Sequence, residues 1–298
     1  MIFREITLEH REAVEQLYRR WGHQDSAHSF QSLFLWQEEM RLSLWLEPEL
    51  YCVRSAWRGE NDWFFPCGEP NAVEEFVRRR MEETGAPLRF LYVCAEDAAF
   101  LEANFPGAFQ LCHMPDDDEY LYDKGEQLAL QGKKFRHQRG AVNRIGQSSS
   151  VTVRMVDADT MNDAWSILSQ SHDLQSSAAN TLTSCSADRM LIANWDALGM
   201  FGVIVYENGV PAALTAGYFL SEECFDISTS RQVLDQVSLA VYARHRLFGA
   251  LPAGVDTINA EEDLGMEGLR QLKLGMRPSR IQTMYEGKCV CGKNTQRL

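Results

Sequence analysis

An Asn-Gly pair between two apolar runs constrains the fold of this chain more than any other feature. Asn208-Gly209 separates the β-rich run 201–206 from the run 212–220. Asn-Gly favours the two-residue turn that joins antiparallel strands, so the sequence predicts a hairpin here. The elements predicted to follow are a strand, a helix, a strand, a helix and a last strand, over 224–228, 234–248, 255–259, 265–274 and 281–285.

The first half of the chain shows a looser version of the same order. A hairpin is predicted from the runs 50–57 and 63–65, and a strand over 88–94 precedes a helix over 96–104. A length of 298 residues suits about two domains. We therefore predict an α+β chain of two tandem units with mixed sheets.

The seam between the two predicted units lies in a polar break. Gln147-Ser148-Ser149-Ser150 follows a segment that has helical character. We place the first unit at residues 1–146, ending in a basic connecting helix, and the second at residues 147–298.

The charge balance excludes some classes of protein. The chain has 29 basic and 42 acidic residues, a net charge of −13, which argues against a surface that coats nucleic acid or anionic membrane. No apolar run approaches the length of a membrane span, and the first residues lack the pattern of a signal peptide. The sequence thus predicts a cytoplasmic protein without a membrane span.

Cysteine and histidine spacing predicts no metal site. The eight cysteines are scattered along the chain, which indicates reduced thiols rather than a disulfide framework. Cys289 and Cys291 are the one close pair, and no second Cys or His pair follows at zinc spacing. His10, His23 and His28 show no pattern of partners.

A basic segment stands out within this acidic chain. No carboxylate occurs between Glu126 and Asp157, and the gap contains six cations and one histidine. A helix over 124–145 would place a group of polar residues on one face. That face is either a solvated surface paired with acidic loops or a site for an anion such as phosphate; the sharp segregation favours the anion site. The face comprises Lys133, Arg136, His137, Gly140, Asn143 and Arg144.

Three adjacent carboxylates lie between a predicted strand and a predicted helix. Glu261, Glu262 and Asp263 follow Asn259. Acids at this position commonly cap the helix N-terminus. The alternative is that one of them orients or deprotonates an amine at the end of the strand. Lys273 supplies a cation near the same edge.

Two long signatures carry a resemblance to a known family. The first combines Tyr120–Asp123 with Gly132–Arg139, and the second runs from Ile258 to Lys273 and closes with Met276-Arg277-Pro278 and Tyr285. Together they resemble an uncharacterised bacterial family related to the C-terminal domain of phosphatidylglycerol lysyltransferase. The resemblance covers nearly the whole chain. It implies two tandem GNAT-like domains, an architecture shared with Fem-type peptidoglycan aminoacyltransferases, which move an aminoacyl group from tRNA to an amine or lipid hydroxyl.

The resemblance implies an acyl- or aminoacyltransferase that acts on an amine or hydroxyl of a small-molecule or peptide acceptor. Its donor would be aminoacyl-tRNA or acyl-CoA, and the sequence identifies no cofactor besides such a donor. Residues expected to handle the nucleophile and the proton are Asn259, Glu262, Asp263 and Tyr285. Residues expected to bind phosphate or the donor are Lys133, Lys134, Arg136, His137, Arg139, Asn143 and Lys273.

The sequence departs from relatives at one place. The segment 228–235 contains no glycine where acyl-CoA-binding domains have a Gly-rich pyrophosphate turn. Ser228-Thr229 also stands where relatives tend to have a Glu-Lys pair. Two alternatives to catalysis therefore stay open: a regulatory module that binds a phosphorylated ligand, and an RNA-binding protein, which a charge of −13 disfavours.

Overall fold

The computed structural model divides the chain into two interleaved units. It describes residues 2–57, 62–83, 88–175, 185–233 and 237–290. Unit 1 comprises 1–119, 262–267 and 281–298, and unit 2 comprises 120–261 and 268–280. These units differ from the expected halves 1–146 and 147–298. The reason is strand pairing, since residues 119–123 and 285–289 each hydrogen-bond to strands that are distant in sequence.

Unit 1 contains a seven-stranded mixed sheet. Its order is β1-β2-β3-β5-β14-β6, with β4 on β2, and only the β3–β5 pair is parallel. The strands are β1 (Leu42–Leu46), β2 (Leu50–Ser55), β3 (Asp62–Phe64), β4 (Cys67–Gly68), β5 (Arg89–Val93), β6 (Phe109–His113) and β14 (Tyr285–Cys289). The helices are η1 (Leu8–His10), α1 (Arg11–Trp21), α2 (Phe30–Trp36), α3 (Pro70–Glu83) and α4 (Ala95–Asn104).

Aromatic packing fills the core of unit 1. Trp63 and Phe76 are almost fully buried and meet edge to face at 5.9 Å, and Trp45 stacks on Phe76 at 5.3 Å. Such pairs add about 0.5–1.5 kcal/mol beyond the burial of their area. The predicted hairpin is confirmed, because Arg54 pairs with Trp63 in antiparallel register. The turn residues 58–61 lie outside the described part of the chain.

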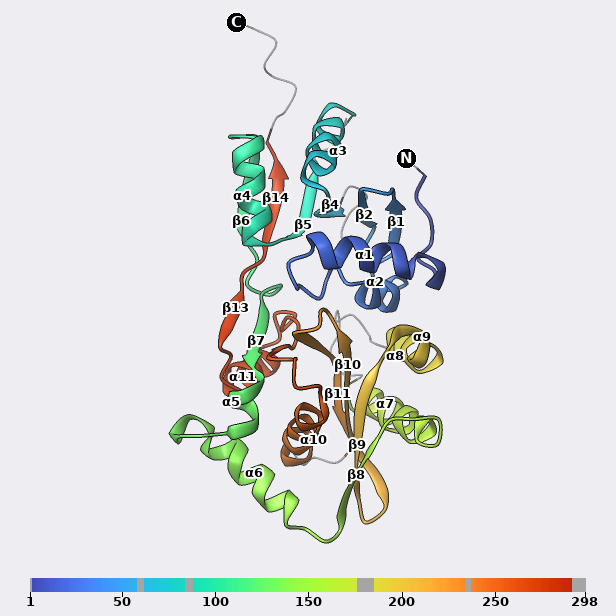
Figure 1. The fold of residues 1–298 in the computed structure, drawn as a ribbon, viewed down its shortest axis with the longest axis vertical. Helices are drawn as coiled ribbons and strands as arrows, with labels where there is room; N and C mark the ends of the chain where they lie inside the picture. Colours follow the sequence, from blue (N-terminus) through green and yellow to red (C-terminus); the bar gives the residue numbers. More distant parts are fainter. Residues whose placement is uncertain (1, 58–61, 84–87, 176–184, 234–236, 291–298) are drawn as a thin grey trace, which may run out of the picture. The chain divides into compact units, whose positions relative to one another are not determined.

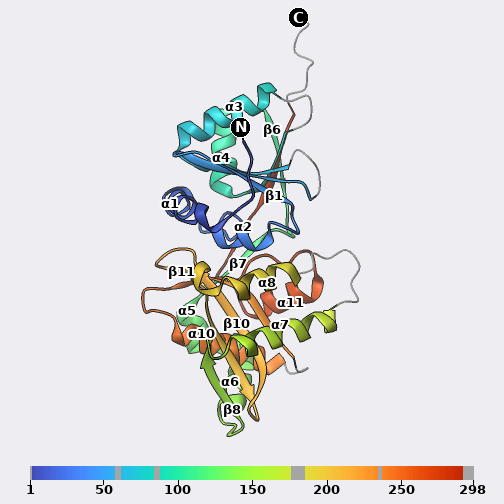
Figure 2. The ribbon, with the colours of Figure 1, turned by 90° about the vertical axis from the view of Figure 1, so that its right-hand side faces the viewer.

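A second seven-stranded mixed sheet, of order β13-β7-β12-β11-β10-β9-β8, belongs to unit 2 except for the last two residues of β13 and the first residue of β7. Helices α7 and α10 lie on opposite sides of this sheet (Figures 1 and 2). The strands are β7 (Glu119–Asp123), β8 (Val151–Met155), β9 (Phe201–Glu207), β10 (Val210–Phe219), β11 (Cys224–Gln232), β12 (Thr257–Asn259) and β13 (Arg280–Gln282). The helices are α5 (Lys124–Ala129), η2 (Lys133–Phe135), α6 (Arg136–Gly146), α7 (Met161–Gln175), α8 (Cys185–Ala193), α9 (Trp195–Leu198), α10 (Val237–Ala250) and α11 (Glu267–Gly275).

The hairpin that anchors the sequence prediction is confirmed. Strands β9 and β10 pair in antiparallel register around Asn208 (φ 53°) and Gly209 (φ 78°). Two positive φ values in succession require a turn that asparagine and glycine adopt easily. The α+β class with two mixed sheets is likewise confirmed.

One predicted strand is wrong. The run 281–285 forms the ends of two short strands, β13 and β14, which belong to different sheets. Thr283 and Met284 separate the two strands. The Met284 N–H donates to the Asp118 carboxylate at 2.9 Å and not to a neighbouring strand. Among the described residues, no helix is long and apolar enough to cross a membrane.

A buried charge pair organises the segment that joins α1 to α2. The Asp25 carboxylate lies 2.6 Å from His28 Nδ1, and His28 Nε2 lies 2.9 Å from the Phe65 carbonyl. Burial opposes a charged imidazole, but the attraction and hydrogen bond of Asp25 outweigh it, and the pKa of His28 is raised to about 9. The hydroxyls of Tyr18 and Tyr51 donate to the backbone carbonyls of Asp25 and His28. The pair therefore stabilises this segment as an imidazolium–carboxylate pair.

This pair predicts a stability that falls with alkaline pH. The folded pKa of His28 lies above its unfolded value of 6.5. The stabilisation is therefore fully present below about pH 6.5 and is lost as the pH rises through about 9. Urea unfolding should show a loss of about 2–3 kcal/mol between these limits. His28→Asn should flatten that slope, whereas the exposed control His137→Asn should keep it; equal slopes in all three proteins would refute the assignment.

Candidate functional site

The sheet of unit 2 opens between two neighbouring strands. Strands β11 and β12 are parallel, and they pair only from Cys224 opposite Thr257 to Asp226 opposite Asn259. Strand β12 ends at Asn259, whereas β11 continues to Gln232. Along 229–232, β11 pairs with β10 alone among the described strands. We call the region where the two strands part the β11 fork, formed by residues 226–232 and Asn259.

A β-bulge lies at the point where the strands part. Ala216 and Tyr218 are two positions apart on β10. Their partners on β11, Thr229 and Asp226, are three positions apart, so β11 has one extra residue. The extra residue on β11 kinks the strand and changes which side chains face each side of the sheet. Gly217 is required opposite the bulge, because a Cβ there would lie 1.6 Å from the Asp226 carbonyl oxygen.

Buried polar atoms without hydrogen-bond partners gather at the β11 fork. Among the described residues, the Ser228 and Thr229 hydroxyls and the Gln232 amide oxygen have none. Such groups are uncommon in folded proteins, because leaving one unsatisfied costs about 1–3 kcal/mol. The next hydroxyl along the strand, Ser230, is 3.2 Å from the Thr215 hydroxyl on β10. The fork thus contains three buried polar groups whose hydrogen-bonding capacity is unused among the described residues.

A buried arginine reaches the same strand from α10. Arg244 is 6% exposed, and its guanidinium lies 3.4 Å from the Ser230 hydroxyl. Burial lowers the pKa of Arg244 to about 10, and the nearby Tyr122 offsets this only in part. Arg244 also lines a cavity of about 20 Å³, enough for a single water, together with Gln127 and Gln138. Arg244 was not among the predicted site residues, although a cation within the mainly apolar segment 239–248 is a signal of a buried charge.

The residues expected to handle the nucleophile are held by backbone contacts. Asn259 is fully buried, and its side-chain oxygen accepts from the Glu261 N–H at 2.8 Å. Asp263 is also buried and accepts from the Gly265 N–H at 2.9 Å. Because α11 begins only at Glu267, Asp263 closes a turn before the helix. Glu262 is half-buried.

Two further predicted site residues lie in different units. Lys273 of unit 2 is buried, donates to the Ala260 carbonyl at 2.5 Å, and lies 5.7 Å from the Tyr120 ring. It therefore supports the chain just after Asn259. Tyr285 lies on β14 of unit 1, 5.9 Å from the His113 ring. The structure thus brings Lys273 to the chain beside Asn259, while Glu262, Asp263 and Tyr285 belong to unit 1.

The basic segment is not the continuous helix that was expected. Helix α5 ends where Leu130 (φ 46°) and Gly132 (φ 79°) take left-handed conformations, and α6 begins only at Arg136. Arg139 holds this break, because its guanidinium donates to the carbonyls of Leu130 and Gly132. Lys133 lies in the short turn η2 and does not share the face of α6.

Besides Arg139, the residues on which the predicted anion site rests divide into two groups. Lys134 forms an ion pair with Glu126 at 2.7 Å, and Arg144 donates to the Ser238 hydroxyl. The other four are exposed, and within the described part of the chain their side chains have no hydrogen bond or ion pair; they are Lys133, Arg136, His137 and Asn143. The first group binds other parts of the protein, and for the exposed group anion binding stays a prediction.

Substitution of Arg244 tests whether its buried charge lowers the stability of the fold. Because burial disfavours its charge, Arg244→Met should raise the unfolding free energy by about 1–3 kcal/mol. The exposed Arg246→Met serves as the matched control on the same helix and should change it by less than about 0.5 kcal/mol. Urea denaturation measures both. Destabilisation by Arg244→Met would instead show that hydrogen bonds to the guanidinium compensate its burial.

The family model described as phosphatidylglycerol lysyltransferase, C-terminal, matches residues 18–286. A conserved protein of unknown function from Bacteroides thetaiotaomicron VPI-5482 superposes with a TM-score of 0.88 at 23% identity, covering 97% of this chain and 100% of that one. L-PGS from Bacillus licheniformis superposes with a TM-score of 0.69 at 13% sequence identity, covering 99% of this chain and 95% of that one. FemX superposes with a TM-score of 0.60 at 9% sequence identity, covering 97% of each chain.

At these identities the solved structures show a shared fold. A search of the curated proteins finds no match. The family model, in contrast, spans nearly the whole chain and confirms the resemblance drawn from the two signatures. The chain therefore belongs to the phosphatidylglycerol lysyltransferase C-terminal family.

Proposed function

We propose that the chain is a GNAT-type acyl- or aminoacyltransferase whose donor carbonyl binds at the β11 fork. The observation that carries the proposal is the group of buried, unpartnered polar atoms of Ser228, Thr229 and Gln232. A reacting acyl group develops negative charge on its carbonyl oxygen. Preorganised hydroxyl donors in a buried site stabilise that charge without reorganising. The family membership supports a transferase of this general kind.

The proposed reaction needs alignment more than strong acid–base groups. The acceptor amine or hydroxyl attacks the donor carbonyl, the ester or thioester bond to the donor breaks, and an amide or ester forms. The acceptor proton leaves to a base. Fixed hydrogen bonds and close positioning supply much of such a rate acceleration. The roles of Asn259, Glu262, Asp263 and Tyr285 in positioning the acceptor and moving this proton stay predictions.

The positive charge of Arg244 would strengthen donor binding at the β11 fork. Its guanidinium lies beside Ser230 on the strand that forms the fork. A buried cation that keeps few protein partners attracts an anionic oxygen of a donor more strongly than an exposed one would. Arg244→Met is therefore expected to weaken donor binding while it leaves the fold intact.

We propose that the exposed basic surface binds the phosphates of the donor. Lys133, Arg136 and His137 are exposed and, among the described residues, have no side-chain partner. Both proposed donors, aminoacyl-tRNA and acyl-CoA, carry phosphate groups. Lys134, Arg139 and Lys273 contribute less directly, because each already binds a protein group.

An alternative function follows from the same fork. None of the three unpartnered side chains can act as a strong base at neutral pH, since two are hydroxyls and one is an amide. That composition also suits a regulatory module that binds a phosphorylated ligand without turnover. The two functions differ in whether the labelled group leaves the donor.

Transfer assays test the proposal. The purified chain is incubated with panels of labelled aminoacyl-tRNAs and acyl-CoAs and with amine and hydroxyl acceptors, and transferred label is measured. Thr229→Val should lower the rate about 10- to 100-fold, because it removes a donor to the oxyanion. It should leave stability unchanged or slightly higher, because the lost hydroxyl is unsatisfied. Thr152→Val, exposed on β8, is the control.

Each outcome of that assay favours one function. Transfer that Thr229→Val slows and Thr152→Val leaves unchanged supports the enzyme. Thermal stabilisation by a donor or its free leaving group, without transfer, supports the regulatory module. Failure of every donor both to bind and to react contradicts both functions.

If the exposed basic surface binds donor phosphates, the affinity for the donor should depend on salt concentration. Lys133→Gln and Arg136→Gln should each weaken donor binding about 3- to 10-fold and reduce its dependence on salt concentration, because each removes a phosphate contact. Arg154→Gln is the control, since Arg154 lies outside α6 and is 4.0 Å from Asp157. Affinity is measured by equilibrium binding at two salt concentrations. Equal losses in all three variants would point to a nonspecific charge effect.

A further inference from the structure

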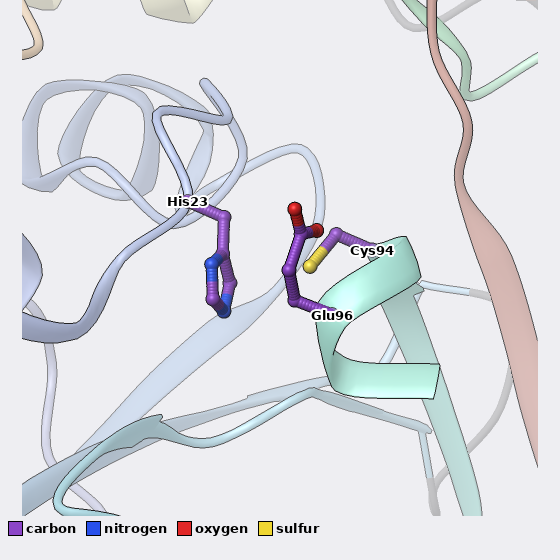
Figure 3. Close-up of side chains that lie close together, drawn as sticks. All are labelled: His23, Cys94 and Glu96. Atoms are coloured by element: carbon purple, nitrogen blue, oxygen red, sulfur yellow. The ribbon is translucent and has the colours of Figure 1, made fainter. Parts of the chain in front are cut away.

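Three potential metal ligands meet in unit 1, and none of them belongs to the β11 fork. His23 follows α1, Cys94 lies between β5 and α4, and Glu96 lies in the first turn of α4. Figure 3 shows the imidazole, the thiol and the carboxylate facing a common space. Their ligand atoms all lie within 4.8 Å of one another. This cluster was not predicted from the sequence, because His23 and Cys94 are 71 positions apart in the chain.

The chemical types of these ligands select one class of ion. A thiolate, an imidazole and a carboxylate are the three ligand types that Zn²⁺ accepts in proteins. Tetrahedral coordination needs ligand atoms about 3.3–3.8 Å apart. Because the ligand atoms lie within 4.8 Å of one another, they need to approach by about 1 Å at most. We propose that unit 1 binds a Zn²⁺ ion through His23, Cys94 and Glu96.

Asp97 provides the support that such a site needs. Its carboxylate lies 3.2 Å from His23 Nε2 and 3.1 Å from Cys94 Sγ. It therefore positions both side chains in the absence of an ion. With an ion bound, Asp97 supports the imidazole through the ring nitrogen that does not bind the metal. Its hydrogen bond from Cys94 ends when the thiol loses its proton. Binding of the ion displaces the thiol proton to solvent and forms the zinc–sulfur bond.

Burial makes Cys94 unsuited to act as a free nucleophile. Cys94 is 1% exposed, and its thiol donates to the Asp97 carboxylate at 3.1 Å. An enclosed thiol is inert toward electrophiles. A divalent cation that enters the cluster stabilises the thiolate directly, so metal ligation is a chemistry that this geometry allows for Cys94.

The exposed side of the cluster gives the ion a path from solvent. The His23 side chain is 33% exposed and Glu96 is exposed, whereas the sulfur lies on the inner side. Three protein ligands leave a fourth position for water or another ligand. The bound ion would join the segment after α1 to the start of α4. That segment also contains Asp25 and the charge pair that stabilises it.

Metal titrations test the proposal with the full chain. Chelator-treated protein is titrated with ZnCl₂ by calorimetry and with CoCl₂ by absorption spectroscopy. One equivalent of each ion should bind. The Co²⁺ complex should show a thiolate-to-metal charge-transfer band in the near ultraviolet. Saturating Zn²⁺ should also raise the melting temperature by about 5 °C.

Substitutions identify the ligands. Cys94→Ser keeps an oxygen that caps α4, so the fold is retained, while the charge-transfer band should disappear and the affinity should fall at least about 10-fold. Glu96→Gln changes an exposed side chain and should lower the affinity without removing the band. Cys112→Ser, a half-buried cysteine of the same unit, is the matched control and should change neither.

Two results would overturn the proposal. The first is the absence of stoichiometric binding, or a Co²⁺ spectrum without the charge-transfer band. The second is a band that survives Cys94→Ser but is lost in Cys289→Ser, which would assign the ion to the Cys289–Cys291 pair. Retention of the wild-type circular dichroism spectrum by Cys94→Ser shows that a loss of binding is not a loss of folding.

Discussion

The end of strand pairing between β11 and β12 determines the chemistry that unit 2 can carry. Backbone hydrogen bonds hold the strands together as far as Asp226 and Asn259, and a bulge then turns β11 away. A continuous ladder would leave no room for a ligand between them. Gly217 permits the bulge, because the Asp226 carbonyl occupies the space of a side chain at that position. Backbone geometry therefore ends the pairing of the two strands, and the β11 residues beyond that point carry unpartnered polar atoms.

The sequence predicted local elements well and their assignment to sheets poorly. Asn208-Gly209 identified the β9–β10 hairpin, because two left-handed residues in succession are nearly specific to such turns. The last predicted strand failed, because apolar spacing over 281–285 carries no information about partners. Its two ends hydrogen-bond in different sheets. Partners of a strand depend on tertiary structure, which a single sequence does not encode locally.

The candidate site shows the same limit. The carboxylate gap predicted an anion site on one continuous helix, and that site stays a prediction. The helix is interrupted at a break held by Arg139, which depends on hydrogen bonds that no periodicity reveals. Arg244 escaped notice, because its burial is a property of the packed helix α10. His23 and Cys94 likewise become neighbours only through folding. Residue types identify candidates, and only the fold groups them.

Strand β14 has a consequence for how the protein is made. It pairs with β5 and β6 and fills the gap between them, although about 170 residues separate β6 from β14 in the chain. A ribosome therefore releases every residue of unit 2 before the sheet of unit 1 is complete. The amino-terminal unit finishes folding last, and until then β5 and β6 each have an edge that is open to wrong partners. Premature termination near residue 280 would leave unit 1 incomplete in a chain whose other unit is almost whole.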